Sequence, residues 1–313
     1  MAGVERALVA ERPRLLGLAY RITGSRVDAE DVVQEAWERA RRAGGDDVER
    51  PSAWLTTVVS RLALDRLKSA QHRRETYVGP WLPEPVVAVG SPVAAARRGG
   101  DDPAHLAEMA ESLTFGFLRV LEALSPVERV VFVLADVFGV PYTEIAEVVD
   151  RSPAACRQVA SRARSRVREG RVREGHRPGT SAEGAAHGGE AEEVADRLVE
   201  ALLDGDTERV VALLASDVVL VSDGGPDVHA ARRPVVGQDR VGRLLVNLTR
   251  RTIELGVTYE RRTVNGQAGA VALWGGTTLA VVAAAVDGAR VSEIHVVVNP
   301  GKLAALGLTD PIE

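Results

Sequence analysis

The sequence contains very little cysteine and lysine. Cys156 is the only cysteine, so no intramolecular disulfide can form, which is typical of proteins in a reducing cytoplasm. Lys68 and Lys302 are the only lysines, and the other 37 basic residues are arginine. Arginine suits bidentate contacts with phosphate and guanine, although a GC-rich genome would give the same composition. The composition therefore permits nucleic-acid binding without establishing it.

Long hydrophobic runs are also missing. Charges interrupt the N-terminal segment MAGVERALVAERPR, so we expect no secretory signal, and no segment approaches the length of a membrane span. We therefore expect a cytoplasmic protein without membrane contact. The single cysteine and the absence of metal-ligand spacing predict no metal site, and we expect no cofactor.

Positive charge is scarce overall but unevenly distributed. The net charge of −5 alone argues against a nucleic-acid binder. Residues 1–177 hold 27 basic and 25 acidic side chains, whereas residues 178–313 hold 12 and 19. A near-neutral front half and an acidic back half indicate different partners for the two halves.

Periodicity and composition divide the 313 residues into several parts. Helical spacing runs through the first part, where Asp28 is the expected N-cap of its second helix. A Pro- and Gly-rich stretch then predicts a linker, helices resume, a polar Gly-rich stretch follows, and a mixed helix and strand pattern ends the chain. We expect a multidomain fold of two all-α domains and one α+β domain. The expected domains are residues 1–76, 104–169 and 190–313, and the expected linkers between them are residues 77–103 and 170–189.

A helix-turn-helix is predicted near residues 142–168, where the sequence reads PYTEIAEVVDRSPAACRQVASRARSRV. A short helix would end before the turn at 150–152, and Ser152 and Pro153 suit the start of the next helix. Ala154, Val159 and Ala163 are expected on its buried side, and Cys156 is expected to pack rather than react.

The exposed face of this second helix carries the residue types that enter a major groove. Small residues at its start would allow close approach, and Arg or Gln would reach base edges. Further arginines would contact phosphates. An Arg-rich solvated helix of an ordinary bundle is the alternative. The expected DNA-binding residues are Ser152, Arg157, Gln158 and Arg162 on the base side, Ser161 on the same exposed face, and Arg164, Arg166 and Arg168 on the phosphate side.

Two earlier helices carry contrasting faces. The helix at 28–43 has an acidic stripe at helical spacing, which is either a solvated face or a dock for a basic partner. The helix at 51–76 has polar and basic residues that could follow a DNA strand, or that simply face solvent. The acidic stripe comprises Asp31, Gln34, Glu35 and Glu38. The polar face of the second helix includes Arg61, Asp65, Lys68, His72, Arg73 and Arg74.

These pieces, in this order, resemble bacterial sigma factors of the extracytoplasmic-function (ECF) group. Their region 2 is similar to YRITGSRVDAEDVVQEAW and the following AWLTTVVSRLALDRL. Their region 4 is similar to LEALSPVERVVFVLADVFGVPYTEIAEVVDRSPAACRQVASRARSRV. The resemblance implies that the acidic stripe binds core RNA polymerase and that the helix around 61–74 reads and opens the minus-ten promoter element. It implies that the helix starting at Pro153 reads the minus-thirty-five element.

The chain from about residue 190 resembles a SnoaL-like domain, an α+β cone that a subgroup of these sigma factors carries after region 4. That subgroup shares WLPEP in the linker between regions 2 and 4, DGGGK early in the extra domain and NPDKL near its end. By resemblance, the domain contacts the sigma core and regulates it in place of a separate anti-sigma factor. The matching residues are Trp81, Leu82, Pro83, Glu84, Pro85, Asp223, Gly224, Gly225, Asn299, Pro300, Lys302 and Leu303.

The match has two departures, and the WLPEP segment has a second interpretation. Pro226-Asp227 replaces Gly-Lys, and Gly301 replaces an aspartate, so a positive charge and a carboxylate are missing. A tryptophan between prolines presents a stiff apolar surface, which predicts a docking site, although packing on the nearest helix is the alternative.

The third domain could instead sense a small molecule or act as a cyclase-like enzyme, which would need an acid-base residue in the cone. Glu293 and His295 alternate on one strand face, with Ile294, Val296 and Val298 on the other, and Asp223 and His229 are further candidates. We expect no catalytic site. A one-component repressor is a third possibility, but it leaves the acidic stripe unexplained. The sequence thus predicts an ECF-type sigma factor that binds core RNA polymerase and promoter DNA.

Overall fold

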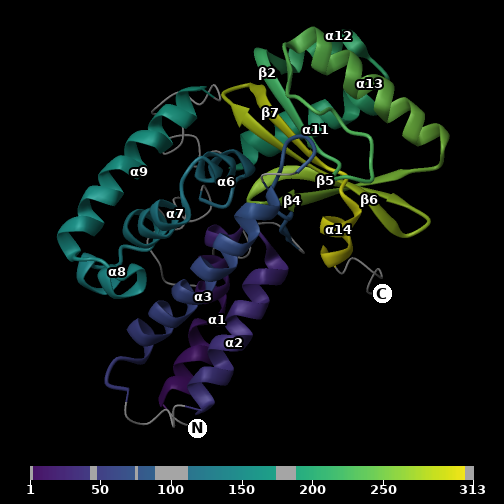
Figure 1. Ribbon diagram of the computed structural model, residues 1–313. Coiled ribbons are helices and arrows are strands. Elements are labelled where there is room, and N and C mark those ends of the chain that lie inside the picture. Colours follow the sequence, from purple (N-terminus) through teal and green to yellow (C-terminus); the bar gives the residue numbers. More distant parts are fainter. Residues whose placement is uncertain (1–2, 43–47, 75–76, 89–111, 174–187, 307–313) are drawn as a thin grey trace. The chain divides into compact units, whose positions relative to one another are not determined.

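The computed structural model describes residues 3–42, 48–74, 77–88, 112–173 and 188–306. The chain packs into two compact units: 1–76 with 116–173, and 77–115 with 174–313 (Figure 1). The described residues of the expected linker, 77–88, are therefore part of the C-terminal unit and do not form a free connector. Within these described ranges, no helix is long and apolar enough to cross a membrane.

The first unit begins with three long helices, α1 (Gly3–Thr23), α2 (Arg26–Arg42) and α3 (Pro51–Arg74). Gly24 adopts a φ of +70° between α1 and α2, where the chain reverses. The Ser25 hydroxyl accepts a hydrogen bond from the Asp28 amide at 3.0 Å and so caps α2. The expectation of an N-cap at Asp28 was wrong by three residues, because the helix begins at Arg26.

The same unit continues with α6 (Phe115–Glu122), α7 (Pro126–Phe132), a π-helical turn (Val133–Val137), α8 (Tyr142–Val149) and α9 (Pro153–Arg173). Ser125 and Glu128 form a capping box that starts α7. Helix α9 runs past residue 169, where a linker was expected. Gly170 permits this because a Cβ there would lie 3.0 Å from a methyl group of Val120. The rest of the expected linker, 174–187, lies outside the described residues, as does the expected helical segment 104–111.

The second unit contains α11 (Gly188–Leu203), α12 (Thr207–Leu213), α13 (Gln238–Glu254) and a seven-stranded sheet. Its strands, in the order β1-β4-β5-β6-β7-β2-β3, are antiparallel neighbours except for the parallel pair β2 and β7. The bounds are β1 Val87–Ala88, β2 Leu214–Asp223, β3 Val235–Val236, β4 Thr258–Val264, β5 Gln267–Trp274, β6 Thr277–Asp287 and β7 Arg290–Val297.

Each face of this sheet has its own hydrophobic core. On one face, residues of α11, α12 and α13 pack against sheet residues that include Leu220 of β2 and Ile294 of β7. The other face is covered by Leu82 of the linker, by Phe115, and by Leu303 of the short helix α14 (Pro300–Leu303). Figure 1 shows α12 and α13 on one side of the sheet and α14 on the other. The alternation of side chains along each strand therefore separates two environments within one domain.

Candidate functional site

The helix-turn-helix follows from local capping and from one apolar stripe. Helix α8 ends at Asp150, which adopts a left-handed φ of 53°, and the Ser152 hydroxyl accepts a hydrogen bond from the Ala155 amide at the start of α9. Ala154 is exposed, so its expected buried place was wrong, and Cys156 fills that position at 0% exposure. The buried stripe of α9 is Cys156, Val159, Ala160, Ala163 and Val167.

The opposite side of α9 is open to solvent. The exposed residues include all the expected base-side positions, Ser152, Arg157, Gln158 and Arg162, and also Ser161 and Arg168. Among the described residues, Arg157 and Arg162 form no salt bridge, so their guanidinium groups are available to an external acceptor. This face has the donors and the small first-turn residues that a recognition helix needs.

Arg164 and Arg166 differ from these residues because each has an acidic partner in the same unit. Arg164 donates to Asp136 at 2.6 Å and to the Tyr142 hydroxyl at 2.9 Å. The hydrogen bond with Asp136 raises the pKa of Arg164. The guanidinium of Arg166 lies 2.5 Å from Glu128. The two arginines therefore join α9 to the helices beneath it, a role that spacing along one helix does not reveal.

Glu128 connects the capping box to this ion pair. Burial raises the pKa of its carboxyl, but the hydrogen bonds from the Ser125 side chain and backbone and the charges of Arg166 and Arg162 outweigh burial and lower it. Glu128 is therefore held in the charged form, which is the form that accepts from both Ser125 and Arg166.

The polar face of α3 contacts the helix-turn-helix. The Arg61 guanidinium donates to the backbone carbonyl of Glu147 at 2.6 Å, and Arg50, just before α3, pairs with Glu144 of α8 at 2.6 Å. Asp65 and Lys68 form an exposed pair at 3.6 Å. The structure describes the backbone of His72, Arg73 and Arg74 at the end of α3, but not their side chains.

The acidic stripe of α2 is on the surface and is partly neutralised. Asp31, Gln34 and Glu38 are exposed and Glu35 is half-buried. Glu35 pairs with Arg39 at 2.8 Å, Glu38 pairs with Arg42 at 3.0 Å, and Asp31 lies 3.6 Å from Arg66 of α3. A basic partner could therefore replace the arginines in these exposed ion pairs with its own charges. The free-energy cost would be small, because exposed ion pairs contribute little in water.

Two buried arginines were missed by sequence reasoning. Arg21 is 2% exposed, donates to the Gly17 carbonyl at 2.9 Å and lies 5.5 Å from the centre of the Phe138 ring. Burial lowers its pKa to about 10. Arg129 of α7 is 1% exposed, pairs with Glu122 and donates to the Arg21 carbonyl at 3.1 Å. These contacts join α1 to α7 and to Phe138, which follows the π-helical turn. The only available signal was an arginine within an apolar helix stripe.

The expected regulatory motifs converge in the second unit. Asp223, at the end of β2, is fully buried and accepts hydrogen bonds from the Leu82 amide at 2.8 Å, from the Tyr77 hydroxyl and from the Lys302 ammonium at 2.6 Å. Lys302 also donates to the Leu82 carbonyl and lies 4.2 Å from the centre of the Trp81 ring. Both backbone groups of Leu82 are therefore bound by this ion pair. We call Tyr77, Trp81, Leu82, Asp223, Asn299 and Lys302 the linker clasp.

The neighbouring motif residues complete this arrangement. Asn299 donates to the Tyr77 hydroxyl at 2.7 Å, and a Cβ on Gly225 would lie 2.6 Å from the Asn299 amide nitrogen. Burial and the hydrogen bond with Asp223 raise the pKa of Tyr77, which keeps its hydroxyl a donor. Gly301, one of the two departures, contributes only its amide, which donates to the Asn299 side chain at 3.0 Å. The remaining motif positions are Pro83 and Pro85, which are buried, half-buried Glu84, buried Gly224, exposed Pro300 and buried Leu303.

Two of the four candidate acid-base residues come together, but outside the cavity. A cavity on the helix-covered face of the sheet is lined by Ile294, Val296 and Val298. Glu293 and His295 lie on the other face, where His295 Nε2 is 3.4 Å from the Glu293 carboxylate and the imidazole is 5.5 Å from the Phe115 ring. Asp223 belongs to the linker clasp, and only His229 of the four candidates lines the cavity. Within the described ranges, no group of three or more potential ligands could hold a metal ion.

Comparison with known proteins identifies the family. The model of Sigma-70 region 2 matches residues 8–73, and the model of Sigma-70, region 4 matches residues 115–167. The ECF RNA polymerase sigma factor SigJ of Mycobacterium tuberculosis is 44% identical over 246 residues, which cover 77% of this chain and 72% of the relative. This chain belongs to the ECF RNA polymerase sigma factors. A second relative of this ECF sigma factor is the probable ECF RNA polymerase sigma factor SigI of Mycobacterium tuberculosis. The two are 33% identical over 303 residues, which cover 97% of this chain and 96% of the relative.

A solved structure extends the comparison beyond the sigma regions. The crystal structure of the Mycobacterium tuberculosis extracytoplasmic function sigma factor SigJ matches this ECF sigma factor with a TM-score of 0.70 at 37% identity. The match covers 96% of this chain and 98% of that one, so it includes the C-terminal sheet. The expected fold class, two all-α sigma regions followed by an α+β domain, is confirmed.

Proposed function

We propose that this ECF sigma factor binds core RNA polymerase in the cytoplasm, directs initiation at specific promoters and is regulated by its own C-terminal unit. In this proposal, Asp31, Gln34, Glu35 and Glu38 dock on polymerase. The exposed residues of α3 contact the minus-ten element, and the open face of α9 reads the minus-thirty-five element. Family membership and the open face of α9 support these roles.

The linker clasp is the observation that carries the regulatory part. The segment that joins regions 2 and 4 is held by a buried ion pair from the C-terminal unit, with Asp223 on one side of Leu82 and Lys302 on the other. Because this linker limits how far region 2 and region 4 can separate, holding or releasing residues 77–88 would change which promoter spacings the protein can bridge. The fused domain would then do the work of a separate anti-sigma factor.

Contacts within the first unit support a resting state that must open. Arg61 of α3 is bonded to the backbone of α8, and Arg50 is paired with Glu144. In this arrangement the expected DNA-binding face of α3 and the helix-turn-helix contact each other. Promoter binding by both elements would require Arg61 to exchange the Glu147 carbonyl for a DNA phosphate or base.

Run-off transcription with core polymerase on fragmented genomic DNA, followed by sequencing of the transcript 5′ ends, tests the proposal. The wild-type chain should produce a defined set of start sites that share upstream sequence elements. A Lys302→Met variant keeps the length of the side chain but removes the charge that binds Leu82, so it should change the amount or the spacing preference of the same starts. A chain that ends after Arg173, which retains all of α9, and one lacking residues 299–313 serve as further comparisons.

The two parts of the proposal fail separately in this experiment. If no form of the protein supports defined start sites above core polymerase alone, the initiation proposal is wrong. If the wild type and Lys302→Met give the same starts at the same levels and spacings, the regulatory role of the linker clasp is wrong while initiation stands.

A further inference from the structure

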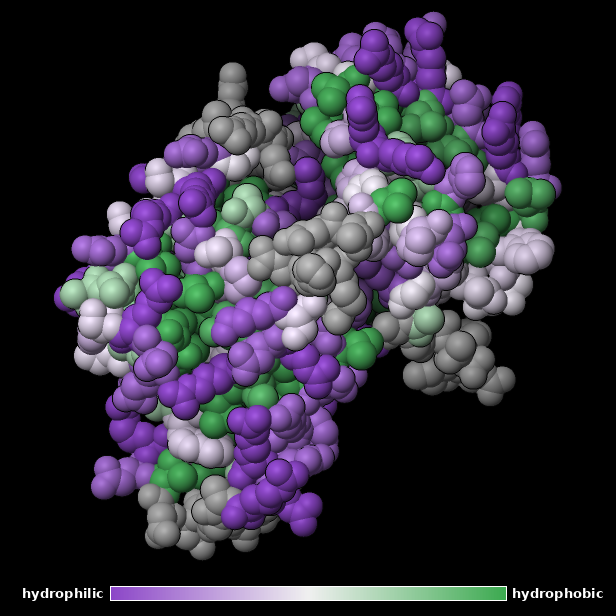
Figure 2. Space-filling view, in the orientation of Figure 1, coloured by the Kyte–Doolittle hydropathy of each residue, from purple (hydrophilic) through white to green (hydrophobic). Residues whose placement is uncertain are grey.

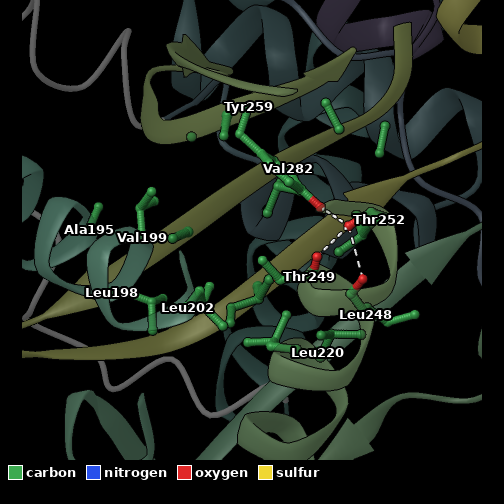
Figure 3. Close-up of a pocket in the computed structure, with 18 of the residues that line it drawn as sticks. Ala195, Leu198, Val199, Leu202, Leu220, Leu248, Thr249, Thr252, Tyr259 and Val282 are labelled. Carbon is green, nitrogen blue, oxygen red and sulfur yellow. Dashed lines mark hydrogen bonds between the residues drawn. The ribbon is translucent and has the colours of Figure 1, made fainter. Parts of the chain in front are cut away.

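The proposed function leaves a cavity of the C-terminal unit unused. It has a volume of about 850 Å³ and lies between α11, α13 and one face of the sheet (Figure 3). Ligand pockets for small organic molecules are typically about 300–1,000 Å³. The space therefore suits one such molecule, and no residue of the linker clasp lines it.

The walls of this cavity are aliphatic. Leu198, Val199 and Leu202 of α11 face Leu220 and Val282 of the sheet across the space (Figure 3). Val282 lies on β6, an interior strand, yet it is partly exposed, because the cavity rather than a helix side chain is in front of it. Such a surface gains free energy when an apolar group replaces water.

The entrance is apolar as well. Leu203, Leu248 and Leu279 line the cavity and are also 50%, 49% and 39% exposed. Figure 2 shows hydrophobic side chains on the surface over the end of α13, where Ile253 and Leu255 are 41% and 70% exposed. Exposed apolar residues that continue into a cavity mark a ligand-binding site more often than chance exposure does.

Both arginines of the lining are paired with carboxylates. Arg261 of β4 lies 2.8 Å from Asp196 of α11, which also lines the cavity, and Arg262 lies 2.5 Å from Glu260, which does not. Two arginines near the cavity are thus already neutralised within the protein. The lining also contains Glu192, so it offers an anion no net positive charge, which favours a neutral ligand.

One polar pair lies within the cavity, between the hydroxyls of Thr252 and Tyr259, and either oxygen could supply its hydrogen (Figure 3). The Thr252 hydroxyl also lies 2.9 Å from the Leu248 carbonyl and 2.8 Å from the Thr249 carbonyl, and both carbonyls can only accept. We therefore assign the single Thr252 hydrogen to these carbonyls and the hydrogen of the hydroxyl pair to Tyr259. With its own hydrogen used, the Tyr259 oxygen is left as an acceptor facing the cavity. A ligand that meets it needs a donor.

We propose that this cavity binds a neutral, mainly apolar small molecule that donates a hydrogen bond from a hydroxyl group to the oxygen of Tyr259. The aliphatic walls supply affinity, and the tyrosine oxygen distinguishes a hydroxyl from an ether or a carbonyl. The site requires no polymerase and no DNA, so it goes beyond the proposed role in transcription.

Equilibrium dialysis of the full-length chain against 1-naphthol and 1-methoxynaphthalene tests the proposal. The two probes share the same ring, and only 1-naphthol has a donor. Both should bind saturably, with 1-naphthol tighter by about fivefold, the factor that one neutral hydrogen bond contributes. Tyr259→Phe should remove this preference and leave the affinity for 1-methoxynaphthalene unchanged.

Matched substitutions identify the site. Val282→Phe fills the cavity and should abolish binding of both probes, whereas Val236→Phe makes the same change on exposed β3, outside the lining, and should leave binding intact. Val199→Phe fills the cavity from α11. It replaces Val282→Phe in this test if Val282→Phe shows no cooperative thermal unfolding by circular dichroism. Absence of saturable binding by the wild type, or wild-type affinity in a folded cavity-filling variant, would overturn the site. A preference for 1-naphthol that persists in Tyr259→Phe would overturn the assignment of the hydroxyl. Either result leaves the transcription proposal standing, because the assay contains no polymerase.

Discussion

The ammonium of Lys302 lies 2.6 Å from the carboxylate of Asp223, and both side chains are almost completely buried. The two residues are 79 positions apart, and each also bonds a backbone group of Leu82. A buried ion pair of this kind contributes little net stability, but losing one partner leaves an uncompensated charge. The pair is therefore suited to hold one segment in one place.

Neutralising Asp223 should release the linker. In Asp223→Asn the buried ammonium loses its counter-charge, which costs about 3 kcal/mol or more. Segment 77–88 should then open roughly a hundredfold more often. Hydrogen exchange of the peptides that contain Leu82, followed by mass spectrometry, measures this change. Asp217→Asn is the control, because Asp217 is on the same strand but exposed. Equal protection of the Leu82 amide in both variants would show that the clasp does not hold the linker.

Arg157 and Arg166 should affect DNA binding differently. Arg157 is exposed on the open face of α9, so Arg157→Ala should weaken holoenzyme binding to specific promoters by about 1–3 kcal/mol and change little on unrelated DNA. Arg166→Ala should weaken binding to promoter DNA and to unrelated DNA alike, and should reduce the salt dependence of binding. The reduction should be smaller than the loss of one full phosphate contact would give, because Arg166 already pairs with Glu128. Fluorescence anisotropy over a series of KCl concentrations separates the two effects. The same loss on every sequence for both variants would reject the groove assignment.

Charge reversal of the acidic stripe should abolish polymerase binding. Lysines at Asp31 and Glu35 would repel Arg66 and Arg39 within the protein and any basic dock on polymerase. Native-gel or interferometry titration of core polymerase measures the loss. The control is Asp287→Lys, one reversal of the same kind on an exposed residue that ends β6, compared with each of Asp31→Lys and Glu35→Lys alone. Polymerase affinity that is unchanged by the double reversal would place the docking surface elsewhere.

The stability contributed by Glu128 should depend on pH in one direction. Its pKa is lowered in the folded chain, so the unfolded state binds the proton more readily. The contribution is therefore fully present above the ordinary pKa of 4.5 and is lost as the pH falls through the folded value. Glu128→Gln keeps the capping geometry and removes the charge. It should cost up to about 1 kcal/mol at pH 7, because Arg166 is half-exposed, and nothing in stronger acid. Chemical denaturation from pH 7 to pH 3 tests this, and a difference that grows in acid would contradict it.

Local patterns were sufficient for most elements of this fold. Apolar spacing and capping residues located α8 and α9, because these signals depend on a few neighbouring residues. The family resemblance brought Trp81, Asp223 and Lys302 into one regulatory set, and the structure brings these residues into contact.

The differences from expectation have tertiary causes. Gly170 reads as a helix breaker, but its lack of a side chain is what permits α9 to pass Val120. Spacing along α9 could not reveal the ion pairs of Arg164 and Arg166, because their partners Asp136 and Glu128 lie on other helices. Strand β1 is only two residues long and forms by pairing with β4, more than 170 positions later, which a local pattern cannot reveal.

The linker clasp also sets an order in time. Leu82 cannot be bound on both sides until Lys302, 220 residues later, has been synthesised. At typical translation rates of about 5–20 residues per second, this delay is on the order of ten to forty seconds. During that interval the helices of both sigma regions can already fold, while the segment between them has no partner. A newly made chain therefore passes through a form in which its C-terminal residues do not yet bind the linker. Slow translation of the last domain would prolong that form.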